Sequence, residues 1–186
     1  MGNPSRVDGD RGSRPVSLVS RRPRRQLSRP DSGDAERLRE AMREVRAVYA
    51  ELEARPVERN CMARTECCRF RLTGRTPQLT RGEALVAAMG WRAAGRRELP
   101  REEAADGACP FLGKDGRCQV YQERPFGCRT HFCEAAGGMR DRAEVLDLIR
   151  RLEAIDEVLG GDGSKGLGSA VEEAWGSSAN LGRRRR

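Results

Sequence analysis

Aromatic residues are scarce in this chain, with two Trp, two Tyr and four Phe among 186 residues. Hydrophobic residues make up 37% of the sequence and charged residues 34%. The length allows one domain of ordinary size with flanking tails. A domain with so little apolar mass buries a thin core, so we expect a cross-link or a bound metal to add stability.

Long hydrophobic runs are also missing. No apolar run reaches the roughly 18 residues that a membrane-spanning helix needs, and the longest one extends only from Ala84 to Met89. The pair Arg21-Arg22 is followed by Arg24-Arg25 rather than by an apolar segment, which argues against a twin-arginine signal. We therefore expect a cytoplasmic protein without a membrane partner.

The chain has only one histidine, His131. No spacing around it supports a Ser/His/Asp triad, and no glycine-rich loop follows a predicted strand and opens a helix, so nucleotide binding has no signal. A cysteine nucleophile activated by His131 stays open, because such a pair needs only spatial proximity. The sequence thus leaves open whether the protein is an enzyme.

Acidic residues are outnumbered, and the formal net charge is +8. The basic excess belongs to the ends: residues 1–30 hold eight Arg against two Asp, and residues 183–186 are all Arg, so residues 31–182 are slightly acidic. A folded nucleic-acid-binding domain usually carries its basic patch on the domain itself. This distribution argues against a nucleic-acid partner and gives no sign of a particular protein partner.

Apolar periodicity predicts a mainly α fold. One amphipathic helix is expected over residues 35–54 and another over 140–159. Between them, Thr80 and Glu83 form a capping box that opens a short helix over 81–89, which Gly90 is expected to end.

We expect the two long helices to bracket a cysteine-rich loop region with minimal β structure. The segment C-Q-V-Y (118–121) could form a short strand after a tight turn at 114–116, and Arg124-Pro125 with Gly127 predicts a second turn. A short helix could start at Ser169 and end near Trp175. The predicted organisation is a disordered Arg-rich arm over 1–33, a metal-binding domain over 34–160 and a flexible C-terminal tail over 161–186.

All seven cysteines fall into two groups. The first consists of Cys61, Cys67 and Cys68, and the second consists of Cys109, Cys118, Cys128 and Cys133. Thiols stay reduced in the cytoplasm, so metal ligation is favoured over disulfides, redox-labile thiols or plain buried cysteines. Thiolates suit zinc, Cu(I) and iron–sulfur clusters.

The spacing limits how the cysteines share metal atoms. Zinc–sulfur bonds of about 2.3 Å bring sulfurs on one ion to within roughly 4 Å of each other. Neighbouring side chains such as Cys67 and Cys68 point in different directions in a helix or strand, which suits a polynuclear cluster or a single ligand of the two. Seven thiolates exceed one tetrahedral zinc and favour an iron–sulfur cluster over zinc without excluding zinc.

Three further stretches carry a family resemblance: C-P-F-L (109–112), C-Q-V-Y (118–121) and R-P-F-G-C-R (124–129). With the two cysteine groups, they make residues 57–160 resemble the YkgJ-type cysteine-cluster family, CxxCxxCC, whose name describes a zinc- or iron-chelating domain. The resemblance implies metal binding by the matching positions, which are Cys61, Cys67, Cys68, Cys109, Cys118, Cys128 and Cys133. Its opening motif places a second cysteine where this chain has Arg64, so one of eight expected thiols is missing.

The leading hypothesis is a metal-binding protein whose cysteines hold zinc or an iron–sulfur cluster. The alternative is an iron–sulfur oxidoreductase or protein-modifying enzyme that uses the cluster. His131 could replace the missing thiol as a ligand, or it could be a polar neighbour of the site. Arg124 and Arg129 could neutralise the negative charge of a thiolate cluster, or they could be ordinary surface arginines.

Overall fold

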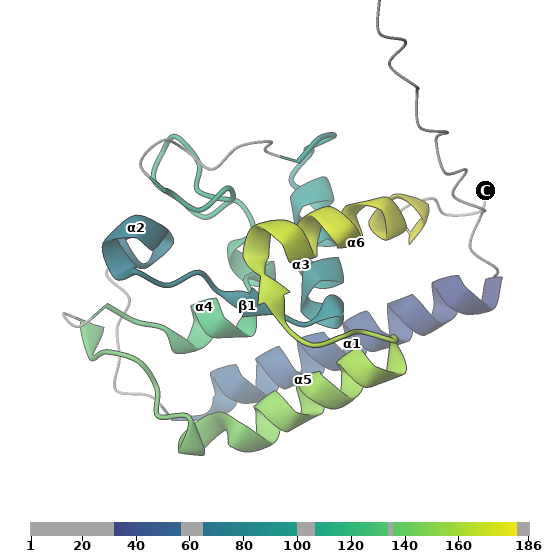
Figure 1. The fold of residues 1–186 in the computed structure, drawn as a ribbon, viewed down its shortest axis with the longest axis horizontal. Helices are drawn as coiled ribbons and strands as arrows, with labels where there is room; N and C mark the ends of the chain where they lie inside the picture. The colour runs from purple at the N-terminus through teal and green to yellow at the C-terminus, as the bar shows by residue number, and fades with distance from the viewer. Residues whose placement is uncertain (1–31, 57–64, 100–106, 134–135, 182–186) are drawn as a thin grey trace, which may run out of the picture.

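A computed structural model describes residues 32–56, 65–99, 107–133 and 136–181. Almost all regular structure in these ranges is helical, and the strands form one two-stranded sheet, which confirms the mainly α fold class (Figure 1). Residues 1–31 of the predicted arm, Cys61 and Arg64 lie outside the described residues, whereas residues 32 and 33, predicted as part of the arm, already belong to the first helix. No helix in the described ranges is both long and apolar enough to cross a membrane.

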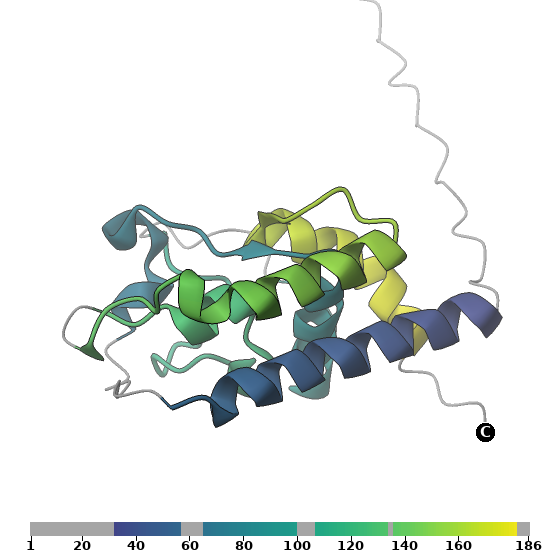
Figure 2. The ribbon, with the colours of Figure 1, turned by 90° about the horizontal axis from the view of Figure 1, so that it is seen from below.

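Two long helices lie side by side along one face of the molecule: α1 (Ser32–Ala54) and α5 (Leu146–Val158). Both views show them running in opposite directions (Figures 1 and 2). Most of the apolar stripe predicted for α1 is buried, with the exposed fraction of Met42, Val45, Tyr49 and Leu52 at 5% or less. Leu38, the first residue of the predicted stripe, is only partly buried. The predicted helix over 140–159 begins later, because a 3₁₀ turn at Ala143–Val145 precedes α5.

The central helix is α3 (Arg81–Ala93), and the predicted capping box of Thr80 and Glu83 is present at its start. Residues 82–88 of α3 are all buried, because α1, α5 and α6 pack around the helix. The prediction that Gly90 ends this helix is wrong, since α3 continues to Ala93. A Cβ on Gly90 would lie 2.8 Å from Cβ of Glu123, so glycine is needed there for close packing rather than for termination.

The prediction of a flexible tail after residue 160 is also wrong for most of that segment. Lys165–Gly166 forms strand β2, which pairs antiparallel with β1 (Gln78–Leu79), and α6 (Leu167–Leu181) packs against α3. Helix α6 is longer than the short helix expected from Ser169 to Trp175. Its inner face consists mostly of small side chains, which let the two helices approach closely: Leu167, Ala170, Val171, Ala174, Ser178 and Leu181.

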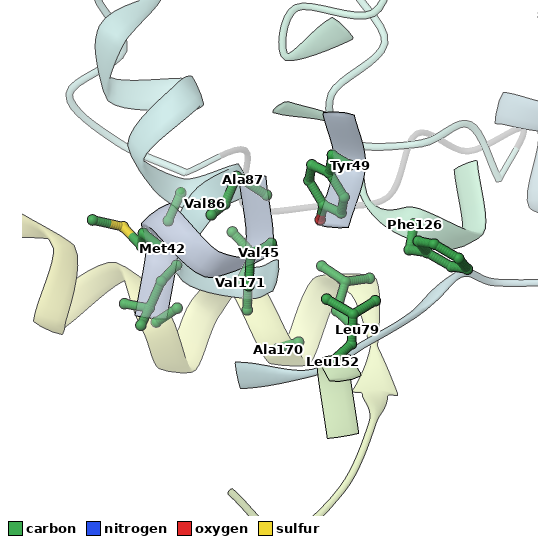
Figure 3. Packing of buried hydrophobic residues seen from close by; sticks show 14 of the residues in the cluster. Met42, Val45, Tyr49, Leu79, Val86, Ala87, Phe126, Leu152, Ala170 and Val171 are labelled. Carbon is green, nitrogen blue, oxygen red and sulfur yellow. The ribbon is translucent and has the colours of Figure 1, made fainter. Parts of the chain in front are cut away.

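One continuous hydrophobic core joins these helices. Figure 3 shows its centre, where side chains of α1, α3, α5 and α6 meet, with Val45, Val86, Leu152 and Val171 among those labelled. The same core includes Cys109, Phe111 and Phe126 from the cysteine-rich segments. The cysteine-rich part therefore packs on the helical part and does not form a separate core.

Candidate metal centre

Six of the seven cysteines lie in the described part of the chain, and all six are free thiols. They come from three segments that are separate in sequence: Cys67 and Cys68, then Cys109 and Cys118, then Cys128 and Cys133. The disulfide alternative therefore has no support among these six residues.

Backbone hydrogen bonds place the first cysteine group beside the start of the second. The amide of Cys109 donates to the carbonyl of Cys68 at 2.6 Å, and the amide of Phe70 donates to the carbonyl of Gly107 at 2.9 Å. Arg69 and Ala108 also form an isolated antiparallel bridge. The upstream segment thus folds onto the downstream one, as joint ligation by the two groups requires.

A sharp turn directs the adjacent cysteines toward one another. Thr65 has the left-handed backbone conformation, with φ of 58°, and the 3₁₀ turn Glu66–Cys68 (η1) follows it. The Sγ atoms of Cys67 and Cys68 lie 4.0 Å apart. The expectation that these side chains diverge is not met, because it assumed regular helix or strand, and 4.0 Å is close to the sulfur spacing around one metal ion.

Cys118 follows a small loop rather than beginning a strand. Gly116 has a φ of 73° and its amide donates to the Gly113 carbonyl, which confirms the turn at 114–116. Within the described ranges, Cys118 pairs with Leu112 in an isolated antiparallel bridge rather than in a strand. The predicted strand C-Q-V-Y is wrong beyond this bridge, because the 3₁₀ turn η2 (Tyr121–Glu123) follows at once.

Cys128 lies on the short helix α4 (Phe126–Thr130), in place of the turn predicted around Gly127. Pro125 precedes the helix, and its carbonyl accepts from the amide of Cys128 at 2.9 Å. The first amide of α4, from Phe126, donates to Oε1 of Glu83 at 2.8 Å. A contact from α3 therefore anchors the helix that carries Cys128.

Five thiols interact electrostatically, which shows that their segments converge. The pKa of Cys109 is raised to about 12, mainly by burial and in smaller part by negative charge on Cys118 and Cys67. Burial also raises the pKa of Cys128, with added repulsion from Cys109, Cys118 and Cys67. Because the thiolates repel one another in a poorly solvated place, the cluster favours a cation that would compensate the charge.

Cys67 and Cys68 behave as one titrating pair. The hydrogen bond from Cys68 lowers the pKa of Cys67, and the same bond raises the pKa of Cys68 well above its ordinary value. One thiolate therefore forms readily and the second forms only with difficulty. A thiolate that is available in this way is the species that binds soft metals.

The described cysteines come from segments that fold together, but they do not form a complete set of ligands around one metal ion. Within the described ranges, no group of three or more Cys, His, Asp or Glu side chains is already placed to hold one metal ion. Cys61 lies outside those ranges. Metal sites in small domains are commonly completed when the metal binds, so this geometry suits a site that closes around its ion.

His131 and Cys133 lie beyond the end of α4. Burial first, and then the positive charge of Arg75, lower the pKa of His131, so the imidazole is neutral near pH 7. The backbone carbonyl of Cys133 accepts from the amides of Ala136 and Gly138. Both residues follow within three positions of the end of α4, which carries Cys128.

The two arginines of the R-P-F-G-C-R stretch have different roles. The positive charge of Arg124 lowers the pKa of both Cys67 and Cys118, after larger effects from burial and hydrogen bonds. Arg129 is buried and donates instead to Glu53 and to the carbonyls of Gln122 and Arg124. Charge compensation by Arg124 agrees with the sequence interpretation, whereas Arg129 fastens α4 to α1 and to the preceding loop.

A pocket of about 520 Å³ opens beside Cys118. Its walls come from the end of α3, including Met89 and Gly90, and from the segment around Tyr121 and Glu123.

The comparison with known families agrees with this geometry. Residues 59–145 match the model of the CxxCxxCC family, described as "Putative zinc- or iron-chelating domain". That span, slightly less than half of the chain, is similar to this family. The matched span contains all seven cysteines. Helices α1 and α6 lie outside it and pack against α3, which lies inside it. No curated protein and no solved structure matches the chain.

Sequence reasoning missed the contacts of two residues that support the cysteine-rich segments. The sequence predicts Glu83 only as a capping residue and Tyr49 only as part of the apolar face of the first helix. Both lie in the core, and the Tyr49 hydroxyl donates to Oε1 of Glu83 at 3.3 Å. A glutamate in an otherwise apolar helix was the available signal, because a carboxylate is rarely buried without partners.

Proposed function

We propose that the chain binds iron or zinc through thiolates of Cys67, Cys68, Cys109, Cys118 and Cys128, with Cys61 and Cys133 completing the set. The observation that carries this proposal is the meeting of separate cysteine segments: the Cys109 amide donates to the Cys68 carbonyl at 2.6 Å, and the Sγ atoms of Cys67 and Cys68 lie 4.0 Å apart. Negative charge on Cys109, Cys118 and Cys67 also raises the pKa of Cys128, after the larger effect of burial. Buried like charges of this kind are stable when a cation compensates them. Arg124 supplies part of that compensation from one side.

The number of converging thiols favours a centre with more than one metal atom. One tetrahedral zinc takes four ligands, and five thiols already interact in the described part of the chain. This favours an iron–sulfur cluster or a two-zinc site over a single zinc ion. The bound metal would hold residues 65–70, 107–118 and 126–130 together. It would thereby stabilise a domain whose core contains few aromatic residues.

Anaerobic purification followed by a visible spectrum and by iron, zinc and sulfide analysis tests this proposal. Brown protein with stoichiometric iron and sulfide supports the cluster, and colourless protein with bound zinc supports the zinc site. Protein without metal, in which every thiol titrates freely, overturns the proposal. Cys128→Ser is expected to lower metal content, whereas Thr130→Ser on the same helix is the matched control and should leave it unchanged.

The second candidate is an iron–sulfur oxidoreductase or protein-modifying enzyme. It is favoured by the pocket beside Cys118, which would let a substrate group approach the centre. An iron–sulfur cluster would supply electron transfer at that place. A visible spectrum that changes reversibly on reduction, while the helical circular dichroism stays constant, supports this candidate, and a spectrum insensitive to reductant argues for a structural centre.

The same chemistry suggests where the protein works. Free thiols that hold a metal persist in a reducing compartment, so we place the protein in the cytoplasm. Metal bound by protein isolated directly from cells, before any thiol reductant is added, is the result expected from this placement.

A further inference from the structure

Glu83 is a buried carboxylate with an unusually full set of donors. Only 3% of the residue is exposed. Oε2 accepts from the amide of Thr80 at 3.0 Å and from its hydroxyl at 2.9 Å. Oε1 accepts from the hydroxyl of Tyr49 at 3.3 Å and from the amide of Phe126 at 2.8 Å. The carboxylate thus joins α1, α3 and α4 at one point.

Helix capping accounts for only one of the two oxygens. The capping box consists of the reciprocal contacts between Thr80 and Glu83, and Oε2 makes the side-chain part of it. Oε1 contacts residues 34 and 43 positions away in sequence, which the cap does not require. Since burial of a carboxylate is costly and an exposed Glu could cap the helix equally well, the second oxygen points to a further role.

That role concerns α4, which holds Cys128. Phe126 is the first residue of this five-residue helix, and Cys128 follows two positions later. On its other side, Arg129 ties the helix to Glu53 of α1. A short helix held at its first amide and at Arg129 has little freedom to move Cys128.

We propose that Glu83 is a positioning residue of the metal centre, whose Oε1 fixes the start of α4 and so sets where the Cys128 thiol meets the other four. This inference rests on the proposed function. It adds a buried carboxylate in a helix of the core to a site otherwise made of cysteines. Groups that hold a metal ligand in place commonly affect metal affinity nearly as strongly as the ligands themselves.

The test compares Glu83→Gln with Thr80→Ala. In either orientation of the new amide, its NH₂ group faces hydrogen-bond donors, so the hydrogen bonds to one of the two carboxylate oxygens are lost. Thr80→Ala removes the side-chain contacts of the cap and leaves Oε1 with its two partners. We expect Glu83→Gln to weaken zinc or iron binding by about 10- to 100-fold, and Thr80→Ala to leave affinity unchanged at the same fraction of folded protein.

A second readout does not depend on metal. In metal-free folded protein, alkylation of Cys128 relative to Cys109, followed by mass spectrometry of the peptides, should speed up in Glu83→Gln and stay constant in Thr80→Ala. If the native chain binds no metal, the proposed function fails, and this readout alone decides whether Glu83 positions Cys128.

A third variant covers the case in which Glu83→Gln does not fold. Tyr49→Phe removes one donor to Oε1 and keeps every charge, so we expect a smaller acceleration of Cys128 alkylation in the same direction. Equal alkylation ratios and equal metal affinities in the native chain, Thr80→Ala and whichever of the two Oε1 variants folds would overturn the inference.

Discussion

The guanidinium carbon of Arg129 lies 4.2 Å from the centre of the Tyr49 ring. The same tyrosine donates from its hydroxyl to Glu83, so one aromatic residue of α1 contacts both residues that hold α4. Burial, and then the charge of Glu83, raise the pKa of Tyr49 well above its ordinary value, so the hydroxyl keeps its proton and remains a donor. The helix that carries Cys128 is therefore supported by α1 as well as by α3.

Arg129→Lys should destabilise the protein although the charge is kept. Lysine lacks the planar fork that lets Arg129 reach Glu53 and two backbone carbonyls together, and it stacks less well on an aromatic ring. We expect a loss of about 1–3 kcal/mol in the free energy of unfolding, measured by urea titration. The control Arg46→Lys alters a half-exposed pair with Glu123 and should change stability by less than about 0.5 kcal/mol. Equal effects of the two variants would contradict the structural role of Arg129.

Gly90→Ala should destabilise the protein, against the usual gain from alanine in a helix. The new Cβ would meet Cβ and Cγ of Glu123 at 2.8 and 2.9 Å, and these atoms are close to the backbone and cannot swing away. We expect a loss of about 1–3 kcal/mol in thermal or urea unfolding.

Gly176→Ala is the matched control for this substitution, because nothing lies within 4 Å of a Cβ at that position of α6. There we expect a gain of about 0.5–1 kcal/mol from helix propensity. A gain at Gly90 as well would show that η2 does not pack tightly on α3.

Arg92→Met should loosen α6. The Arg92 side chain donates to Oγ of Ser178 at 2.8 Å and to the carbonyl of Trp175 at 3.0 Å, and its guanidinium carbon lies 3.5 Å from the centre of the Trp175 ring. Methionine keeps the apolar stem and removes these contacts, so we expect faster amide hydrogen exchange in residues 167–181 than in the unaltered chain.

The control for Arg92 is Arg96→Met, which removes an exposed arginine that contacts Gln119 and Trp91. It should leave exchange in α6 unchanged. Equal amide hydrogen exchange of α6 in the two variants would show that contacts other than those of Arg92 hold α6 against α3.

Acid should weaken the contact between the end of α1 and the start of α5. Hydrogen bonds from Arg55 lower the pKa of Asp147 from 3.8 to about 2, so the ion pair stabilises the folded state fully above pH 3.8 and is lost as the pH falls through 2. Asp147→Asn should therefore be less stable than the native chain at pH 6, and it should lose less stability than the native chain as the pH falls from 3.8 to 2.

Urea unfolding at pH 2, 4 and 6 measures this effect in both proteins. Because the pair is exposed, the difference should shrink in 0.5 M salt. The pKa of Glu51, which also contacts Arg55, is lowered too, so some acid sensitivity remains in the Asn variant. Parallel stability curves for the native chain and Asp147→Asn would contradict the prediction.

Local patterns predicted several elements well. The stripe from Met42 to Leu52 identified α1, and the pairing of Thr80 with Glu83 identified the start of α3. Both signals depend on residues within a few positions of one another, so they can be recognised from the sequence alone. The turn at 114–116 was predicted for the same reason, because Gly116 supplies the positive φ that it needs.

Other elements were decided by contacts between distant residues. Gly90 continues a helix that a glycine commonly ends, because the helix is packed on other elements and needs the space for Glu123. Helix α6 has weak local propensity, with two glycines and four serines or asparagines among fifteen residues. It forms against α3, where its small side chains pack closely and Arg92 binds its last turns.

The sequence by itself determined the mainly α fold class, the two groups of cysteines and, through its spaced motifs, the kind of domain that they form. Those properties follow from residue type and spacing along the chain. Only the tertiary structure decided that five thiols from three segments interact, that Arg124 rather than Arg129 compensates their charge, and that Glu83 reaches the helix of Cys128. These relations depend on backbone turns and on contacts across the core, since a one-dimensional spacing does not fix the direction of a side chain in space.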